Sequence, residues 1–300
     1  MYFPISGVEV NALYLVLLGF VVGALGGFFG VGGGFIAGPI MYVIGIPMNY
    51  VIGTDLAHMT GKSIVASKKH RTLGHVDIKL GLIMVIATMI GIEIGAQIIE
   101  FLENMGEIDK VIGIIYIIIL VAISFFVAWE SKKAMKISRV EKISARDAVA
   151  FKSVSRKIQS LNIPPFVSLP ESGIKSISIW IILFVGLFAG LLSGMLGVGG
   201  GFIRMPLLVY LVGCPTHVAI GTDLFEIVMS SSYGTLTHAM KGNVDILIAL
   251  VMHTGAAVGA QIGATLTKYI SGPKIRLYFS FLPIIGAILV IYKLMSGGVI

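Results

Sequence analysis

The sequence predicts an all-α polytopic membrane protein made of two inverted repeats, each with about five transmembrane or broken helices. The first observation is composition: of 300 residues, 56% are hydrophobic and 12% are charged, and the mean hydropathy is +0.97. A soluble domain carries about 25% charge, so most of this chain's surface is expected to face lipid. The second observation is an internal repeat, and the third is a basic stretch that separates its two copies.

The apolar segments form two sets of five. They lie near residues 11–34, 35–51, 52–67, 78–101 and 110–130, and then near 175–198, 199–213, 217–239, 245–268 and 275–296. A full span needs about 20 apolar residues. The second and third segments of each set are shorter or contain Gly, Pro and charge, so 35–67 and 199–239 are either short spans or re-entrant helices. We divide the chain into a first membrane repeat, 1–130, a basic linker, 131–174, and a second membrane repeat, 175–300.

The internal repeat is visible as ordered matches between the halves. The sequence GVGGGFI occurs at Gly30–Ile36 and at Gly197–Ile203, and IGTDL occurs at Ile52–Leu56 and at Ile220–Leu224. Further matches in the same order are Pro39 with Pro206, Pro47 with Pro215, His70 with His238, Val76-Asp77 with Val244-Asp245, and GAQI at Gly95–Ile98 with GAQI at Gly259–Ile262. So many ordered matches indicate a duplication of nearly the whole chain apart from the linker.

Charge predicts the orientation in the cell membrane. The net charge is +7, and ten of the 22 Lys and Arg residues lie between Lys132 and Lys175. Short basic loops stay in the cytoplasm, so we expect the middle loop there, with five crossings per half and both termini outside. The net charge then reflects topology, and nucleic acid is not an expected partner. An odd number of crossings per half places the copies in opposite orientations, as in many secondary transporters.

The glycine clusters are the first candidate site. A helix broken at glycines leaves backbone N–H groups at its positive end, which favours anions, and broken segments at matching positions mark transporter sites near the membrane midplane. The alternative is close helix packing through small residues. The predicted substrate-binding glycines are Gly32, Gly33, Gly34, Gly199, Gly200 and Gly201.

The two GTDL motifs place a hydroxyl and a carboxylate in an apolar context. Carboxylates inside a membrane are costly and usually functional. We expect Thr54 and Thr222 to contact substrate, and Asp55 and Asp223 to carry protons or to bind a cation. The alternative is helix N-capping, because Thr and Asp are good caps and each motif follows a Gly.

Two positions break the repeat. Arg204 corresponds to Ala37, and its planar guanidinium suits an oxyanion substrate. The alternatives are a salt bridge to Asp223, Glu226 or Asp55, or a side chain that extends to the membrane interface. His58 corresponds to Glu226, and we take both as further candidates for proton coupling.

The duplicated pattern GxxxGxxGVGGGFIxxPxLxxxxGxPxxxAxGTDL around a polar middle loop resembles the sulfite exporter TauE/SafE family. The resemblance covers about residues 12–130 and 175–296. It implies a permease, not an enzyme, for a small sulfur-containing anion such as sulfite or a sulfonate, with no cofactor or metal. One departure is the Asp of both GTDL motifs, where many relatives carry Ser or Asn-like residues. The alternatives are a cation channel or carrier that uses Asp55 and Asp223, and an intramembrane enzyme, for which no nucleophile–base pair or histidine metal motif is evident.

Overall fold

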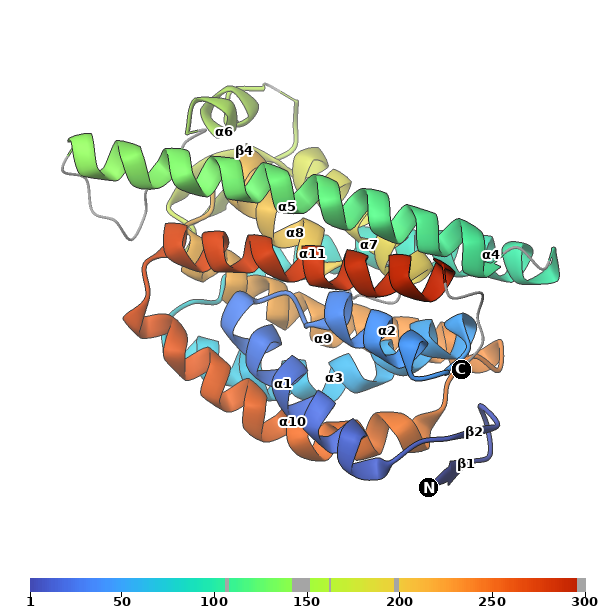
Figure 1. Cartoon of the computed structure of the whole chain (residues 1–300). Helices are drawn as coiled ribbons and strands as arrows, with labels where there is room; N and C mark the ends of the chain where they lie inside the picture. Colours follow the sequence, from blue (N-terminus) through green and yellow to red (C-terminus); the bar gives the residue numbers. More distant parts are fainter. Residues whose placement is uncertain (106–107, 142–151, 162, 197–199, 296–300) are drawn as a thin grey trace.

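The protein is an all-α bundle, and six helices in the part of the chain that the structure describes are long and apolar enough to cross a membrane (Figure 1). The structure is a computed structural model that describes residues 1–105, 108–141, 152–161, 163–196 and 200–295. The six helices are α1 (Ala12–Phe29), α4 (Ile78–Asn104), α5 (Ile108–Glu141), α7 (Ile179–Leu196), α10 (Ile246–Leu266) and α11 (Gly272–Met295). The predicted multi-pass membrane protein is therefore confirmed.

The segments predicted to be broken are short helices followed by longer polar ones. They comprise α2 (Gly34–Val43), α3 (Met48–Thr72), α8 (Gly201–Leu207), the π-helix η1 (Leu208–Val212) and α9 (Thr216–Met240). Pro47 and Pro215 immediately precede α3 and α9, where a missing N–H costs no helical hydrogen bond. Both GTDL motifs therefore lie inside a helix, well after its start, and the N-capping alternative for them is wrong.

The π-helix has an origin in the sequence. Pro206 and Pro215 are separated by one residue more than Pro39 and Pro47, their counterparts in the first half. One extra residue inside a helical segment produces a π-bulge, a feature that is frequent at functional sites. The second half therefore contains a wider turn at Leu208–Val212, where the first half has ordinary α-helix.

Contacts between the halves are reciprocal. Helix α1 packs along α10, and its counterpart α7 packs along α4. Glycines permit this approach, because a Cβ atom on Gly23 would lie 2.3 Å from the carbonyl oxygen of Ala256, and one on Gly190 would lie 2.2 Å from that of Thr88. In this view α5 and α11 lie together on the side of the bundle away from α1 and α10 (Figure 1).

Helices α3 and α9, which carry the GTDL motifs, run antiparallel to each other. Leu56 near the start of α3 contacts Gly234 near the end of α9, whereas His70 near the end of α3 contacts Gly221 near the start of α9. These two corresponding helices therefore point in opposite directions. The predicted inversion relative to the membrane remains a prediction.

One sequence match between the repeats does not correspond in space. Gly95 of the first GAQI faces Leu191 and Met195 of α7. The equivalent place against α1 is taken by Gly263, not by Gly259 of the second GAQI. The two GAQI sequences are therefore displaced by one helical turn, which the repeated spacing of small residues tolerates.

A small β-hairpin precedes the first helix of each half, and the sequence analysis did not predict it. Strands β1 (Tyr2–Phe3) and β2 (Val8–Glu9) pair antiparallel, as do β3 (Phe166–Leu169) and β4 (Ile174–Ser178). Ser6 in the first turn donates to Asp245 Oδ2 at 2.7 Å, and Ser172 in the second donates to Asp77 Oδ2 at 2.6 Å. Each hairpin thus holds the residue that caps a long helix of the opposite half.

Parts of the predicted linker belong to ordered elements. Helix α5 continues through Glu141, and the short helix α6 (Lys152–Gln159) packs on the π-helix, where Gln159 Nε2 donates to the carbonyl oxygen of Val212 at 2.8 Å. The cytoplasmic location of the linker remains a prediction.

In the second repeat, a 3-10 turn, η2 (Thr267–Tyr269), follows α10.

Candidate functional site

Both short helices begin at a glycine in the left-handed backbone region. Gly33 has φ 78° at the start of α2, and Gly200 has φ 69° at the start of α8. This conformation favours glycine because it has no Cβ. No side chain caps either start in the part of the chain that the structure describes. The first amides of each helix are consequently available to other acceptors.

The two glycine turns, which are Gly32–Gly34 before and at the start of α2 and Gly200–Gly201 at the start of α8, meet inside the bundle. A Cβ atom on Gly201 would lie 2.8 Å from Val31 Cα and 2.7 Å from Asp223 Oδ2, and one on Gly32 would lie 2.8 Å from Met59 Sδ. Gly34, at the start of α2, is buried. The turns of both halves and the middle of α3 and α9 therefore share one interior region. Of the predicted glycines, Gly199 lies outside the described residues.

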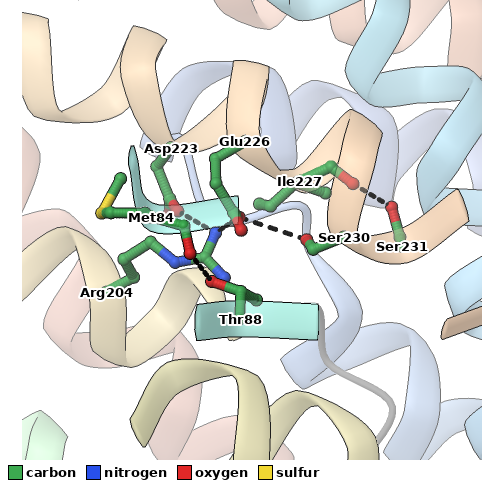
Figure 2. Close-up of polar contacts among 8 residues, drawn as sticks. All are labelled: Met84, Thr88, Arg204, Asp223, Glu226, Ile227, Ser230 and Ser231. Atoms are coloured by element: carbon green, nitrogen blue, oxygen red, sulfur yellow. Dashed lines mark hydrogen bonds and ion pairs between the residues drawn. The ribbon is translucent and has the colours of Figure 1, made fainter. Parts of the chain in front are cut away.

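Arg204 is the centre of a buried charged cluster (Figure 2). Its side chain is 0% exposed, and its Nη1 donates to Asp223 Oδ1 at 2.8 Å and to Glu226 Oε2. Ser230 donates to the same Glu226 oxygen at 3.1 Å. Asp223, Glu226 and Ser230 lie on one face of α9 because residues three or four apart are neighbours on a helix. The salt-bridge alternative for Arg204 is thus realised, and the guanidinium is shared by two carboxylates.

The first half contains a corresponding cluster with a different cation. Asp55, His58 and Lys62 occupy the positions of Asp223, Glu226 and Ser230, and all three side chains are buried. His58 Nδ1 lies 3.3 Å from Asp55 Oδ1 and 3.1 Å from Lys62 Nζ. The positive charge here comes from α3 itself, whereas the second half recruits Arg204 from α8. Lys62 was not among the predicted site residues, although a lysine within a mostly apolar half-repeat indicates a functional position.

Several buried polar atoms of these clusters have no hydrogen-bond partner among the residues that the structure describes. They are Asp55 Oδ2, His58 Nε2, Asp223 Oδ2 and Glu226 Oε1. More than nine in ten buried polar groups in proteins are satisfied. Both clusters therefore hold acceptor atoms that a proton, an ion or a polar solute would satisfy.

The two predicted substrate threonines join the halves. Thr54 Oγ1 accepts from the backbone N–H of Asp245, and Thr222 Oγ1 accepts from that of Asp77, both at 2.9 Å. Both hydroxyls are fully buried. Each hydroxyl oxygen therefore already accepts a structural hydrogen bond. A substrate would have to bind as the acceptor of the hydroxyl proton.

A second buried ion pair lies outside the predicted site. Arg276 Nε of α11 donates to Glu130 Oε2 of α5 at 3.1 Å, and Tyr210 Oη of the π-helix donates to the same oxygen at 2.7 Å. Arg276 also donates to the hydroxyl of Thr216 at the start of α9. Neither Arg276 nor Glu130 was among the site residues that the sequence analysis predicted.

The side chains of the described residues do not form an evident metal site. Within the described residues, no three His, Cys, Asp or Glu side chains are grouped so as to hold a metal ion. The chemistry that the clusters offer is that of paired carboxylates, a guanidinium, an ammonium and an imidazole.

The fold and the site define a polytopic helical membrane protein in which broken helices of two repeats meet at buried charge. A profile of the family described as Sulfite exporter TauE/SafE matches residues 15–290, and the chain belongs to this family.

Relatives match most of the chain. A probable membrane transporter protein of Bacillus subtilis, YunE, is 29% identical over 270 residues, which cover 86% of this chain and 89% of that protein. A probable membrane transporter protein of Methanocaldococcus jannaschii is 24% identical over 89% of this chain and 90% of its own length. No solved structure matches the chain. The protein is thus a member of a family of membrane transporters, and its named relatives are not enzymes.

Proposed function

We propose that the protein is a secondary transporter that moves a small anion across the cell membrane by alternating access. The substrate class is sulfite, a sulfonate or another organosulfur anion, in keeping with the family description. The observation that carries the proposal is the fully buried guanidinium of Arg204, which lies where the glycine turns of both repeats meet. A guanidinium presents donors in a planar fork that suits oxyanions.

Proton coupling follows from the charges around Arg204. One guanidinium and two ionised carboxylates, Asp223 and Glu226, carry a formal charge of −1, and an anion would be repelled. Protonation of Glu226 makes the group neutral and weakens the hydrogen bond that this carboxyl accepts from the guanidinium, which frees an N–H for another acceptor. The released N–H then binds the substrate anion, so that proton and anion occupy the site together.

Alternating access is proposed from the arrangement of the repeats. Corresponding helices α3 and α9 are antiparallel, and contacts between the halves are reciprocal. Movement of one half against the other would expose the central clusters to either side in turn. We retain the expected orientation, with the middle loop in the cytoplasm and both termini outside, as part of this proposal.

A cation carrier or channel is the second candidate. The specific observation in its favour is a set of buried carboxylate oxygens that have no hydrogen-bond partner within the described ranges, Asp55 Oδ2, Asp223 Oδ2 and Glu226 Oε1. Rings of carboxylates select cations in channels. Against this candidate, each of the two clusters also contains a buried cation, Lys62 or Arg204, that would repel the ion.

Transport in proteoliposomes distinguishes the two. With methanesulfonate, which stays ionised over the working range of pH, we expect saturable uptake that an inward proton gradient accelerates. Control liposomes would contain the variant Lys241→Gln, at a partly exposed surface ion pair with Glu100. Flux of Na⁺ or K⁺ without anion flux would overturn the proposal and favour the cation candidate.

A further inference from the structure

An apolar groove of about 410 Å³ opens between α5, α7 and the α8–η1 segment. Its walls include Ile119 and Phe126 of α5, Leu192 of α7, and Ile203, Pro206 and Leu207 of α8. Phe126 and Phe188 at its edge are 43% and 41% exposed. Because α5 and α7 are candidate membrane spans, the groove faces the acyl chains of the bilayer.

The groove is a feature of the second half. In the first half, α11 packs along α2, the short helix that follows the glycine turn. In the second half, α5 takes the place of α11 but does not pack along α8 in this way within the described residues. Along α8 the groove reaches the side chains of Ile203 and Pro206, which are buried, and of Leu207, which is half-buried. Ile203 and Pro206, which line the groove, flank Arg204 in the sequence.

Helix α5 leads from this groove to groups that suit a lipid headgroup. Ile119, Phe126 and Lys133 are seven residues apart and share a helix face. Lys133 Nζ lies 5.4 Å from the centre of the Trp129 ring, and Trp129 is exposed. Trp residues are enriched at membrane interfaces, and juxtamembrane Lys attracts anionic lipids.

The dimensions agree with one phospholipid. The groove follows α5 from Ile118 to Phe126, which is about 12 Å at about 1.5 Å per residue and fits within one leaflet, half of a hydrocarbon core of about 30 Å. Lys133 lies about 10 Å further along the same helix, at the level expected for a headgroup. At the end of the groove the hydroxyl of Tyr210 donates to Glu130 and is therefore not available to a substrate as a donor.

We propose that this groove is a binding site for an anionic phospholipid, with one acyl chain against α8 and the phosphate beside Lys133. The bound chain supplies in the second half the packing that α11 supplies in the first. The lipid thereby supports the helix that holds Arg204. This inference concerns lipid and is independent of which solute the protein carries.

The test uses the full-length protein in nanodiscs that contain phosphatidylglycerol with a photoreactive diazirine at the end of one acyl chain. Cross-linked peptides are identified by mass spectrometry. We expect cross-links concentrated on α5, α7 and α8 around the groove. Ala122→Trp, which fills the groove, should reduce them about tenfold, whereas Ile114→Trp, at an exposed position of α5 outside the groove, should leave them unchanged.

The headgroup is tested by competition between lipids. Lys133→Gln should remove the preference for phosphatidylglycerol over phosphatidylcholine in the groove while it keeps the cross-linked positions. Both Trp variants are first checked for wild-type elution and thermal unfolding, and Leu192→Phe provides a second, milder way to narrow the groove. Cross-links spread evenly over the lipid-facing helices would overturn the proposal. Displacement of the groove cross-links by an alkyl sulfonate, but not by added phosphatidylglycerol, would also overturn it and identify the groove as a substrate site.

Discussion

The hydroxyl of Thr222 in α9 accepts a hydrogen bond of 2.9 Å from the backbone N–H of Asp77, the residue that caps α4. Thr54 makes the matching bond with Asp245, which caps α10. The same aspartates accept from Ser172 and Ser6 of the two hairpins. Each GTDL motif therefore belongs to a chain of hydrogen bonds that fixes the start of a long helix to the middle of the bundle.

Replacement of one threonine by valine tests this structural role. Thr222→Val keeps the side-chain shape but leaves the amide of Asp77 without its acceptor, a loss of about 1–3 kcal/mol for a buried group. We expect a lower free energy of unfolding, measured by denaturation in mixed detergent micelles. Thr254→Val at an exposed site of α10 is the matched control. Equal stability of the two variants would contradict the role assigned to Thr222.

Close packing of α10 on α1 predicts a second effect. A Cβ atom on Gly259 would lie 2.1 Å from the carbonyl oxygen of Phe20, so Gly259→Ala forces the helix backbones apart. Overpacking costs about 1–3 kcal/mol, and the contact with rigid backbone places this case at the upper end. That loss exceeds the gain in helix propensity of about 1 kcal/mol.

The net result for Gly259→Ala is a lower unfolding temperature in a thermal scan. Val258→Ile adds a methyl group to the same helix at a position that is 55% exposed and should have little effect. An unchanged or raised unfolding temperature for Gly259→Ala would show that α1 and α10 are less closely packed than described here.

The ion pair between Glu130 and Arg276 predicts strong coupling in a double-mutant cycle. Glu130→Gln leaves a buried guanidinium with reduced compensation, and loss of one partner of a buried pair costs about 3–5 kcal/mol. The double variant Glu130→Gln with Arg276→Met should be less destabilised than the sum of the single variants. Additive losses in chemical denaturation would mean that the two side chains do not act as a pair.

Much of this architecture could be predicted from the sequence because a membrane restricts the choices. Long apolar segments must be helices, and the repeated GVGGG and GTDL sequences indicated which helices correspond. The π-helix was also encoded, in the extra residue between Pro206 and Pro215, but a single insertion does not show whether a helix will widen or end.

Other features depend on distant contacts. Pro4-Ile5-Ser6-Gly7 and Pro170-Glu171-Ser172-Gly173 share only Pro, Ser and Gly, and their function appears only when each serine reaches an aspartate of the other half. Arg204 was predicted as a site residue, yet its sharing between Asp223 and Glu226 required the approach of α8 to α9. If Arg204 binds the anion as proposed, the two carboxylates and the substrate compete for its guanidinium.

Direct binding of a sulfonate to the purified protein tests this competition most closely. Calorimetric titration with methanesulfonate would compare the wild type with Glu226→Gln and Arg204→Gln. Glu93 of α4, which accepts a hydrogen bond from Gln97, provides the control variant Glu93→Gln for loss of a carboxylate elsewhere in the bundle. A charge-assisted hydrogen bond contributes about 1.5–3 kcal/mol, or about tenfold to a hundredfold in affinity.

The account predicts that Glu226→Gln, which resembles the protonated site, binds methanesulfonate at least about tenfold more tightly than the wild type and with less dependence on pH. Arg204→Gln should lose binding, and Glu93→Gln should match the wild type. Undiminished binding by a folded Arg204→Gln protein, or equal affinity of Glu226→Gln and wild type, would contradict the central claim that Arg204 holds the anion once a carboxylate releases it.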